Sequence, residues 1–150
     1  MRFFRTIGSF ALGAALVLVT GAVLQQPQQQ GEVQYIGNGR FLSNAVRVGN
    51  TLYLSGQLGT SGERGIAPET KAALERIKTL LEANGSHMDD VVKCTVFLAD
   101  FAEWGAMNEV YTTYFTKHRP ARSAVAVSGM ASDARVEIEC MAVIGARNAS

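Results

Sequence analysis

The sequence predicts an α+β domain in which two helices cover one face of a mixed β-sheet. Apolar residues make up 47% of the 150 residues and charged residues 18%, which suits one domain with a single hydrophobic core. Strand-like and helical runs follow in the order β-hairpin, helix, strand, helix, strand, strand. The sheet face without helices must be covered by other groups. Its tyrosine, serine and small residues predict that partner subunits cover it more than open water does.

The first residues are typical of an export signal. Arg2 and Arg5 precede residues 7–24, a run of 18 residues without charge. Residues 1–24 are therefore predicted to be either a signal peptide, cleaved after Ala22, or an uncleaved membrane anchor, because 18 apolar residues just reach the length that spans a bilayer. Both alternatives place the domain outside the cytoplasm, in the periplasm or secreted, and only the anchor implies a membrane partner.

A short polar spacer separates this segment from the domain. Residues 25–32 are rich in glutamine and have little to bury, so they predict a flexible linker. The domain itself is expected over residues 33–146, and residues 147–150 form a C-terminal tail.

The domain begins with a predicted hairpin. Residues 41–48 and 51–57 are strand-like, and the Gly49-Asn50 pair between them is typical of a two-residue turn. Leu52 and Leu54 share one face of the second strand, whereas Tyr53 lies on the other. This strand ends on Ser55 and Gly56, where a polar group meets a glycine that permits close backbone approach. The glycine-rich residues 59–67 then predict a mobile loop.

Two helices and a strand follow. The first helix is predicted to start at Pro68 and to end at Asn84-Gly85. A central strand is expected over residues 91–98, with one face made of Val92, Cys94, Val96 and Leu98. The second helix follows Asp100, whose carboxylate can cap it while Glu103 completes a capping box.

The last two strands each carry a charge that a buried strand disfavours. Arg122 stands at the start of the run that follows Pro120, and Glu137 stands inside residues 136–143. By composition alone, a surface arginine and the polar face of an edge strand are the favoured interpretations.

The sequence carries no motif for metal, redox, serine-hydrolase or nucleotide-binding chemistry. Cys94 and Cys140 match no metal or redox spacing and lie in apolar strands, so buried free thiols are expected, with a disulfide as the alternative outside the cytoplasm. The isolated histidines His87 and His118 define no zinc site, and we expect neither a metal nor a cofactor. The sequence also lacks a nucleophile elbow, a phosphate-binding glycine loop and a dinucleotide fingerprint.

Nucleic acid is not an expected partner. The first 22 residues hold Arg2, Arg5 and no acidic residue, so their removal leaves 12 basic against 13 acidic residues. This balance provides no basic surface for phosphates. Trp104 and the tyrosines at helical spacing therefore favour core and interface roles over a base-stacking platform.

Several motifs resemble the Rid family, the YjgF-like reactive intermediate deaminases that are also labelled endoribonuclease L-PSP-like. They are residues 48–57 (VGNTLYLSGQ), 107–115 (MNEVYTTYF), 119–123 (RPARS) and 136–139 (VEIE). The resemblance covers residues 41–144. It implies a chorismate-mutase-like subunit that assembles as a homotrimer with clefts between neighbouring subunits. It also implies cofactor-free hydrolysis of 2-imino acids, the tautomers of enamines released by pyridoxal-phosphate dehydratases, to 2-keto acids and ammonia.

The resemblance assigns roles to both unusual charges. Arg122 matches the arginine that holds the substrate carboxylate, a role that suits the two parallel donors of a guanidinium. Glu137 matches the glutamate that places the attacking water, and a carboxylate suffices because an iminium carbon is already electrophilic. Four further substrate-binding positions are matched: Ser55, Gly56, Asn108 and Ala124.

The chain also departs from the family pattern. Leu42 stands where a tyrosine is frequent, Met130-Ala131 replaces a Leu-Pro pair, and the loop over residues 59–67 is shorter than usual. Three hypotheses follow: an imine deaminase, a non-catalytic trimer that binds small carboxylates or protects proteins, and a ribonuclease. Retention of both Arg122 and Glu137 favours the deaminase, because carboxylate binding alone needs only the arginine.

Overall fold

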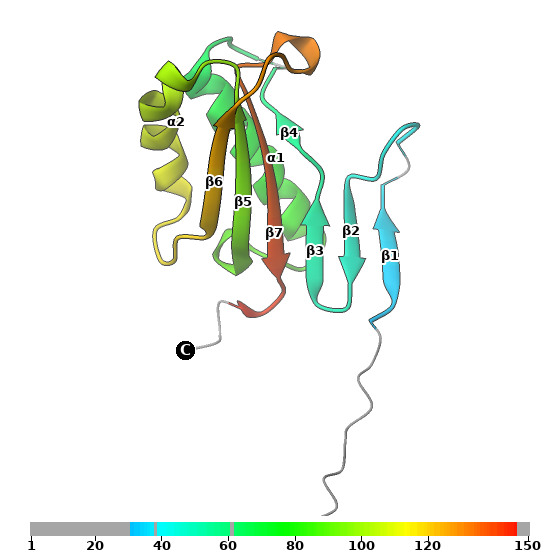
Figure 1. The fold of residues 1–150 in the computed structure, drawn as a ribbon. Helices are drawn as coiled ribbons and strands as arrows, with labels where there is room; N and C mark the ends of the chain where they lie inside the picture. The colour runs from blue at the N-terminus through cyan, green and yellow to red at the C-terminus, as the bar shows by residue number, and fades with distance from the viewer. Residues whose placement is uncertain (1–30, 38, 61, 147–150) are drawn as a thin grey trace, which may run out of the picture.

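The computed structural model describes residues 31–37, 39–60 and 62–146, so the predicted signal or anchor, most of the linker and the C-terminal tail lie outside the described residues. Seven strands and two α-helices make up this part of the chain (Figure 1). The strands are β1 (Val33–Ile36), β2 (Ala45–Val48), β3 (Thr51–Leu54), β4 (Gln57–Leu58), β5 (Val91–Leu98), β6 (Ala121–Ala126) and β7 (Val136–Val143). The helices are α1 (Ile66–Ala83) and α2 (Trp104–Tyr111), with 3-10 turns at Met88–Asp90, Phe101–Glu103, Thr112–Tyr114 and Ala131–Asp133.

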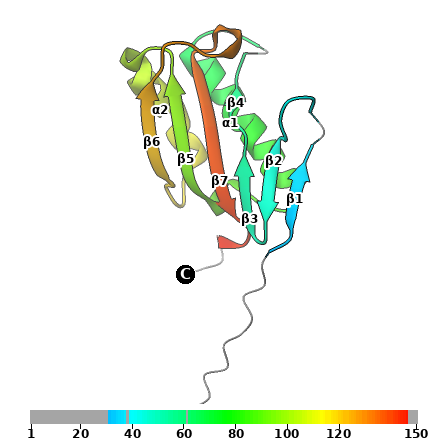
Figure 2. The ribbon, with the colours of Figure 1, turned by 45° about the vertical axis from the view of Figure 1, so that its right-hand side comes forward.

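The strands form one mixed sheet in the order β1-β2-β3-β7-β5-β6, and β4 pairs with β7 beyond the end of β3. Only the β5–β6 pair is parallel among the pairs described; the others are antiparallel. Both helices lie on the same face of the sheet (Figures 1 and 2). The predicted α+β class and the placement of both helices are confirmed.

The core lies between the helices and the sheet. Leu52 and Leu54 are buried beneath α1, whereas Tyr53 between them is 44% exposed on the opposite face, as the alternation predicts. Leu74, Ile77 and Leu81 provide the apolar stripe of α1. The face of the sheet without helices is called the open face below.

Helix boundaries differ slightly from the prediction. α1 begins at Ile66, two residues before Pro68, after Gly65 with a φ of 124°, and it ends at Asn84 and the left-handed Gly85. Before α2, the Asp100 carboxylate accepts a hydrogen bond from the Ala102 amide at 2.9 Å.

The predicted capping box at the second helix is wrong. The Glu103 carboxylate does not accept a hydrogen bond from the Asp100 amide, as a capping box requires. It pairs with Arg135 at 2.7 Å. A tertiary ion pair therefore replaces the local cap.

A β-bulge changes the face assignment at the start of β5. The register against β7 shifts between Val91 and Lys93. Val91 is consequently buried and Val92 is 39% exposed, although the alternation predicts Val92 in the core. The remaining predicted core residues of this strand are buried.

The two cysteines form a disulfide, so the expectation of free thiols is wrong. Cys94 on β5 and Cys140 on β7 are directly opposite in the register, with Cα atoms 4.1 Å apart, and their sulfurs are bonded on the helix-covered face. Each strand taken alone reads as an apolar run with one buried thiol. Only the pairing of β5 with β7 shows that the two thiols meet.

Candidate functional site

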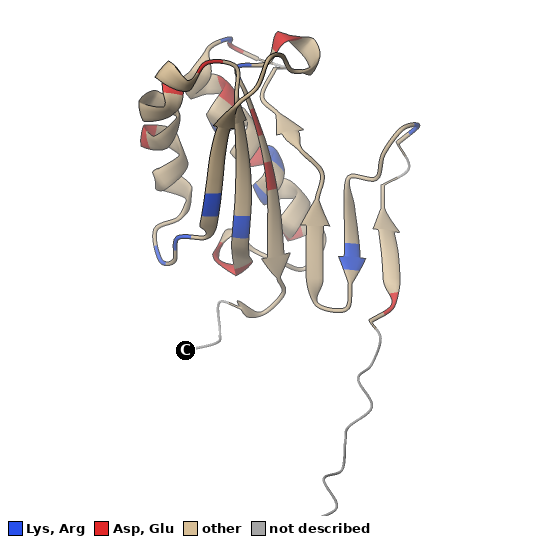
Figure 3. Ribbon diagram, in the orientation of Figure 1, with Lys and Arg blue, Asp and Glu red and all other residues tan. Residues whose placement is uncertain are grey.

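Glu137 lies near the start of β7 and faces away from the helices. Its neighbours Val136 and Ile138 are fully buried in the core, so the Glu137 side chain projects to the open face. Leu58 of β4 and Phe97 of β5 are its cross-strand partners. Within the described part of the chain, its carboxylate forms no ion pair or hydrogen bond. Acidic residues mark β7 in Figure 3.

Gly56 lies directly against this carboxylate. A Cβ atom at position 56 would stand 1.8 Å from Oε1 of Glu137, so any side chain there would displace the carboxylate. The adjacent Ser55 is held in place, because its Oγ donates to the Ser43 carbonyl at 2.7 Å and its own carbonyl accepts from Gln57 at 2.9 Å. The predicted residues Ser55, Gly56 and Glu137 therefore form one group, called the acidic half-site.

A cavity of about 300 Å³ adjoins the acidic half-site. It is lined by Glu137 and by the Met130-Ala131 pair, which is one of the departures from the family pattern. Three further lining residues were not predicted, and they are Phe97, Val127 and Gly129. Alternation on β5 could have placed Phe97 on the open face, but its position beside Glu137 depends on the strand register.

Arg122 lies on β6, an edge strand, and faces the helix side of the sheet. Its register partner is the buried Cys94. The guanidinium carbon lies 4.6 Å from the centroid of the Tyr111 ring and 5.9 Å from that of Trp104. Stacking on aromatic rings orients a guanidinium and leaves its N–H edges available for an anion. No ion pair or hydrogen bond of this side chain occurs among the described residues, so these donors are available.

Two other predicted residues lie with Arg122. Asn108 follows Trp104 by four residues and precedes Tyr111 by three on α2, so the three share a helix face. Ala124 is two residues beyond Arg122 on β6 and therefore points to the same side. Arg122, Asn108 and Ala124 form a second group, called the basic half-site.

The Tyr111 ring lies against the face of the Arg122 guanidinium. Its side chain is buried, and burial raises the pKa of its phenol to about 12 although the nearby Arg122 charge lowers it in part. The ring therefore stays neutral at physiological pH. Its hydroxyl has no hydrogen-bond partner among the described residues. The helical pattern predicts Tyr111 as a core residue, but its contact with Arg122 follows from the packing of α2 against β6.

The two half-sites face different sides of the sheet in one chain. Arg122 is in register with Cys94, whereas Glu137 is in register with Phe97, an odd number of residues further along β5. The structure therefore brings Ser55 and Gly56 to Glu137, and Asn108 and Ala124 to Arg122, but it does not bring the two charges together. Leu42, another of the family departures, is 59% exposed on the connection between β1 and β2.

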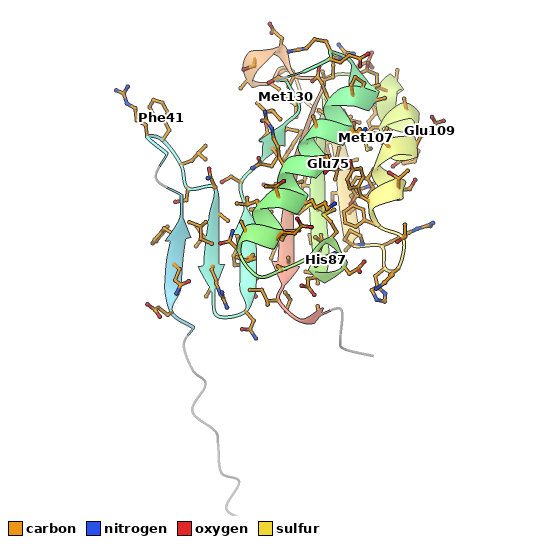
Figure 4. The ribbon with its side chains drawn as sticks, turned by 180° about the vertical axis from the view of Figure 1, so that it is seen from behind. Phe41, Glu75, His87, Met107, Glu109 and Met130 are labelled. Atoms are coloured by element: carbon orange, nitrogen blue, oxygen red, sulfur yellow. A yellow bond between two sulfur atoms is a disulfide. The ribbon has the colours of Figure 1, made fainter. Side chains whose placement is uncertain are left out.

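The open face carries exposed apolar side chains. Tyr53 and Val125 are each 44% exposed, and a hollow of about 220 Å³ is lined on this face by Tyr53, Lys93, Thr95, Glu139 and Met141. The β1–β2 connection extends beyond the sheet, with Phe41 at its tip (Figure 4). Exposed apolar side chains therefore share the open face with Glu137, alongside the charged Lys93 and Glu139.

Neither a metal centre nor a membrane-spanning helix is found in the described part of the chain. No three or more histidine, cysteine, aspartate or glutamate side chains cluster in residues 31–37, 39–60 and 62–146 in a way that could hold a metal ion. None of the helices over these residues is long and apolar enough to cross a bilayer.

Comparison with protein families identifies the domain. The family model described as endoribonuclease L-PSP matches residues 36–144, which is most of the chain. The chain belongs to the endoribonuclease L-PSP family. The match includes every residue of both half-sites, and the resemblance to the YjgF-like Rid family is confirmed.

Relatives within the endoribonuclease L-PSP family include named deaminases. The chain is 44% identical over 80 residues to the 2-iminobutanoate/2-iminopropanoate deaminase of Rattus norvegicus. The aligned region covers 53% of this chain and 58% of that protein. It is 47% identical over 77 residues to a RutC family protein of Pyrococcus horikoshii, covering 51% of this chain and 61% of that protein. The chain therefore covers less than two thirds of the length of these relatives.

Solved structures of the family have the same fold. A protein of the conserved Rid family from Yersinia pestis superposes with a TM-score of 0.72 at 29% identity, covering 75% of this chain and 100% of that one. A member of the YjgF family from Mycobacterium tuberculosis gives a TM-score of 0.70 at 30% identity over the same shares of the two chains.

Proposed function

We propose that this protein hydrolyses 2-imino acids to 2-keto acids and ammonia, in clefts that form between the subunits of a homotrimer. The observation that carries the proposal is the pair of available charges. Arg122 is stacked on Tyr111 with its donors free, and Glu137 is held beside Gly56 with its oxygens free. The names of the deaminase relatives support the reaction, although they match only about half of this chain.

The basic half-site would bind the substrate. A planar guanidinium donates two parallel hydrogen bonds to a carboxylate and stays charged at any working pH. With its face fixed on the Tyr111 ring, Arg122 has less side-chain freedom to lose on binding. Arg122 would therefore set the orientation of the imino carbon.

The acidic half-site would perform the hydrolysis. Glu137 would orient a water and accept one of its protons as the oxygen attacks the iminium carbon, converting the C=N bond to a C–N bond. The carboxyl group would then pass this proton to the nitrogen. As the C–N bond breaks, the hydroxyl oxygen would lose its remaining proton to the Glu137 carboxylate and become the keto oxygen, and ammonia and the keto acid would leave. The water supplies the keto oxygen, so the reaction consumes no other reagent.

The two half-sites can act on one substrate only if they come from different subunits. Within one chain they face opposite sides of the sheet. The open face, which carries the exposed Tyr53 and Val125 as well as Glu137, is a suitable surface for a neighbouring subunit. A cyclic trimer would repeat this contact three times and form three equivalent clefts.

We also propose that the domain works outside the cytoplasm. The Cys94–Cys140 disulfide supports an oxidising compartment, where such bonds persist. The charged and then apolar order of residues 1–24 supports export as well. Fractionation of cells that express the full chain would contradict this proposal if the protein remained in the cytoplasm with both thiols reduced.

The reaction can be tested with the protein from residue 25 onward. An amino-acid oxidase generates a 2-imino acid in situ, and its disappearance is followed with and without the protein. We expect acceleration that Arg122→Ala abolishes and that Glu137→Gln reduces in kcat more than in affinity for a keto acid. If the wild-type protein bound keto acids without accelerating hydrolysis, the chain would be a carboxylate-binding protein and not a deaminase.

A further inference from the structure

A fully buried carboxylate connects three separate segments near the acidic half-site. Glu69, in the first turn of α1, is 0% exposed. Its Oε1 accepts from the Gly65 amide at 3.2 Å and pairs with Nε of Arg64 at 2.9 Å, while its Oε2 accepts from the Arg135 amide at 2.7 Å. Both oxygens are therefore used, as a buried carboxylate requires. Glu69 joins the loop before α1 to the residue that precedes β7.

Arg64 extends this connection to the turn that precedes β7. Its two terminal nitrogens donate to the Ser132 carbonyl at 3.3 and 3.4 Å, and one of them also donates to the Asp133 carbonyl. Ser132 and Asp133 have φ values of 58° and 51°, a left-handed conformation that non-glycine residues rarely adopt. Such a backbone persists only when surrounding contacts hold it. Arg64 supplies these contacts from a loop 68 residues earlier in the sequence.

The held turn is continuous with the wall of the cavity. Met130 and Ala131, which immediately precede Ser132, line the 300 Å³ space beside Glu137. On the other side of the turn, Arg135 is paired with Glu103 at 2.7 Å. The wall and the catalytic carboxylate therefore lie at the two ends of one anchored segment, residues 130–137.

We propose that Arg64 and Glu69 are positioning residues that hold this turn, and thereby fix the distance between the Met130-Ala131 wall and Glu137. Neither residue lines the cavity, so both act through the turn. The wall limits the substituent that fits beside Glu137, so the network sets the size of the substrate side chain. This inference rests on the proposed deaminase function.

The first readout is hydrogen exchange of the backbone amides over residues 130–135, which needs no enzymatic activity. We expect Arg64→Ala to raise exchange in this turn by about tenfold or more, because the carbonyl contacts that close it are lost. The matched control is Lys71→Ala, which removes an exposed cation from α1, the helix that carries Glu69. We expect the control to leave exchange in the turn unchanged.

The second readout is the ratio of the affinities for two keto acids, pyruvate and 4-methyl-2-oxopentanoate. We expect Arg64→Ala to change this ratio by about fivefold or more, since a loosened wall no longer discriminates by size. Lys71→Ala should keep the wild-type ratio. Arg64→Lys keeps a charge for Glu69 but lacks the forked donors, and we expect intermediate values in both readouts.

The outcomes separate this inference from the proposed function. A wild-type protein without turnover would contradict the deaminase proposal, while the exchange rates and the affinity ratio would still test the network. Unchanged exchange in Arg64→Ala would overturn the inference, and so would faster exchange with an unchanged affinity ratio. If Arg64→Ala did not fold, Arg64→Lys would decide by the same two readouts.

Discussion

Arg122 and Glu137 lie on opposite faces of one β-sheet. On the shared neighbour β5, Arg122 is opposite Cys94 in the core and Glu137 is opposite Phe97 on the open face. A strand alternates its side chains with a period of two, so no side-chain rotation within the chain exchanges these faces. A reaction that needs both charges therefore needs two chains.

This relationship predicts complementation between inactive variants. Arg122→Ala and Glu137→Gln should each be inactive alone, but refolding an equal mixture should restore activity. If each cleft of a trimer takes Arg122 from one subunit and Glu137 from its neighbour, about one quarter of the clefts regain both residues. The measurement is imino-acid hydrolysis by the mixed and the separate proteins. Absence of recovery in confirmed mixed trimers would place both residues in the same chain's site.

Gly56→Ala should impair catalysis with little effect on the fold. The added Cβ would stand 1.8 Å from Oε1 of Glu137, so the carboxylate must move away from its position. We expect kcat to fall by about 100-fold, which is typical when a general base is misplaced. The matched control is Gly62→Ala, where a Cβ meets nothing within 4 Å. Equal activity of the two variants would contradict a requirement for glycine at position 56.

The Cys94–Cys140 disulfide should contribute substantially to stability. The two residues are 46 positions apart, and cross-linking a loop of this length is expected to stabilise the fold by about 4 kcal/mol through the entropy of the unfolded chain. Urea unfolding of the oxidised protein and of a Cys94→Ala/Cys140→Ala double variant measures the difference. Thiol titration of the unfolded, unreduced protein should detect neither cysteine, and detection of both would contradict the bond.

Tyr111→Phe should leave the protein as stable as the wild type, or more so, at neutral pH. The buried hydroxyl lacks a hydrogen-bond partner among the described residues, so its removal relieves a desolvation penalty of about 1 kcal/mol. Urea unfolding at pH 7 measures this change. A clear loss of stability would show that the hydroxyl has a partner in solution.

The same variant should alter the response of stability to alkaline pH. Burial raises the pKa of Tyr111 from 10 to about 12 in the folded protein. Below pH 10 the phenol is protonated in both the folded and the unfolded state, so its titration does not yet lower the free energy of unfolding. Between pH 10 and 12 the unfolded chain loses this proton first, and the free energy of unfolding falls by about 2–3 kcal/mol. Urea unfolding between pH 9 and 11.5 should show a smaller fall for Tyr111→Phe. Tyr114, whose pKa is also raised, is present in both proteins and cancels in the comparison.

Much of the fold could be predicted because its signals are local. Leu52 and Leu54 alternate with Tyr53, and the predicted faces are those observed. Asn84-Gly85 ends α1 through a left-handed glycine, as its sequence indicates. Where a distant partner competes with a local signal, the prediction fails, as when Glu103 pairs with Arg135 and leaves the capping box unformed.

The sequence by itself determined the order of both helices and of strands β2, β3, β5, β6 and β7, the buried face of Leu52 and Leu54, and the family, because turn residues, periodicity and motifs are all contained in short windows. It did not predict the short strands β1 and β4. It also singled out Arg122 and Glu137 as charges that strands disfavour. Only the tertiary structure decided that Cys94 meets Cys140, that Arg122 stacks on Tyr111, and that the two half-sites face apart. The reason is physical: register between β5, β6 and β7 is set by packing between segments far apart in the chain, and a shift of one residue would reverse every face.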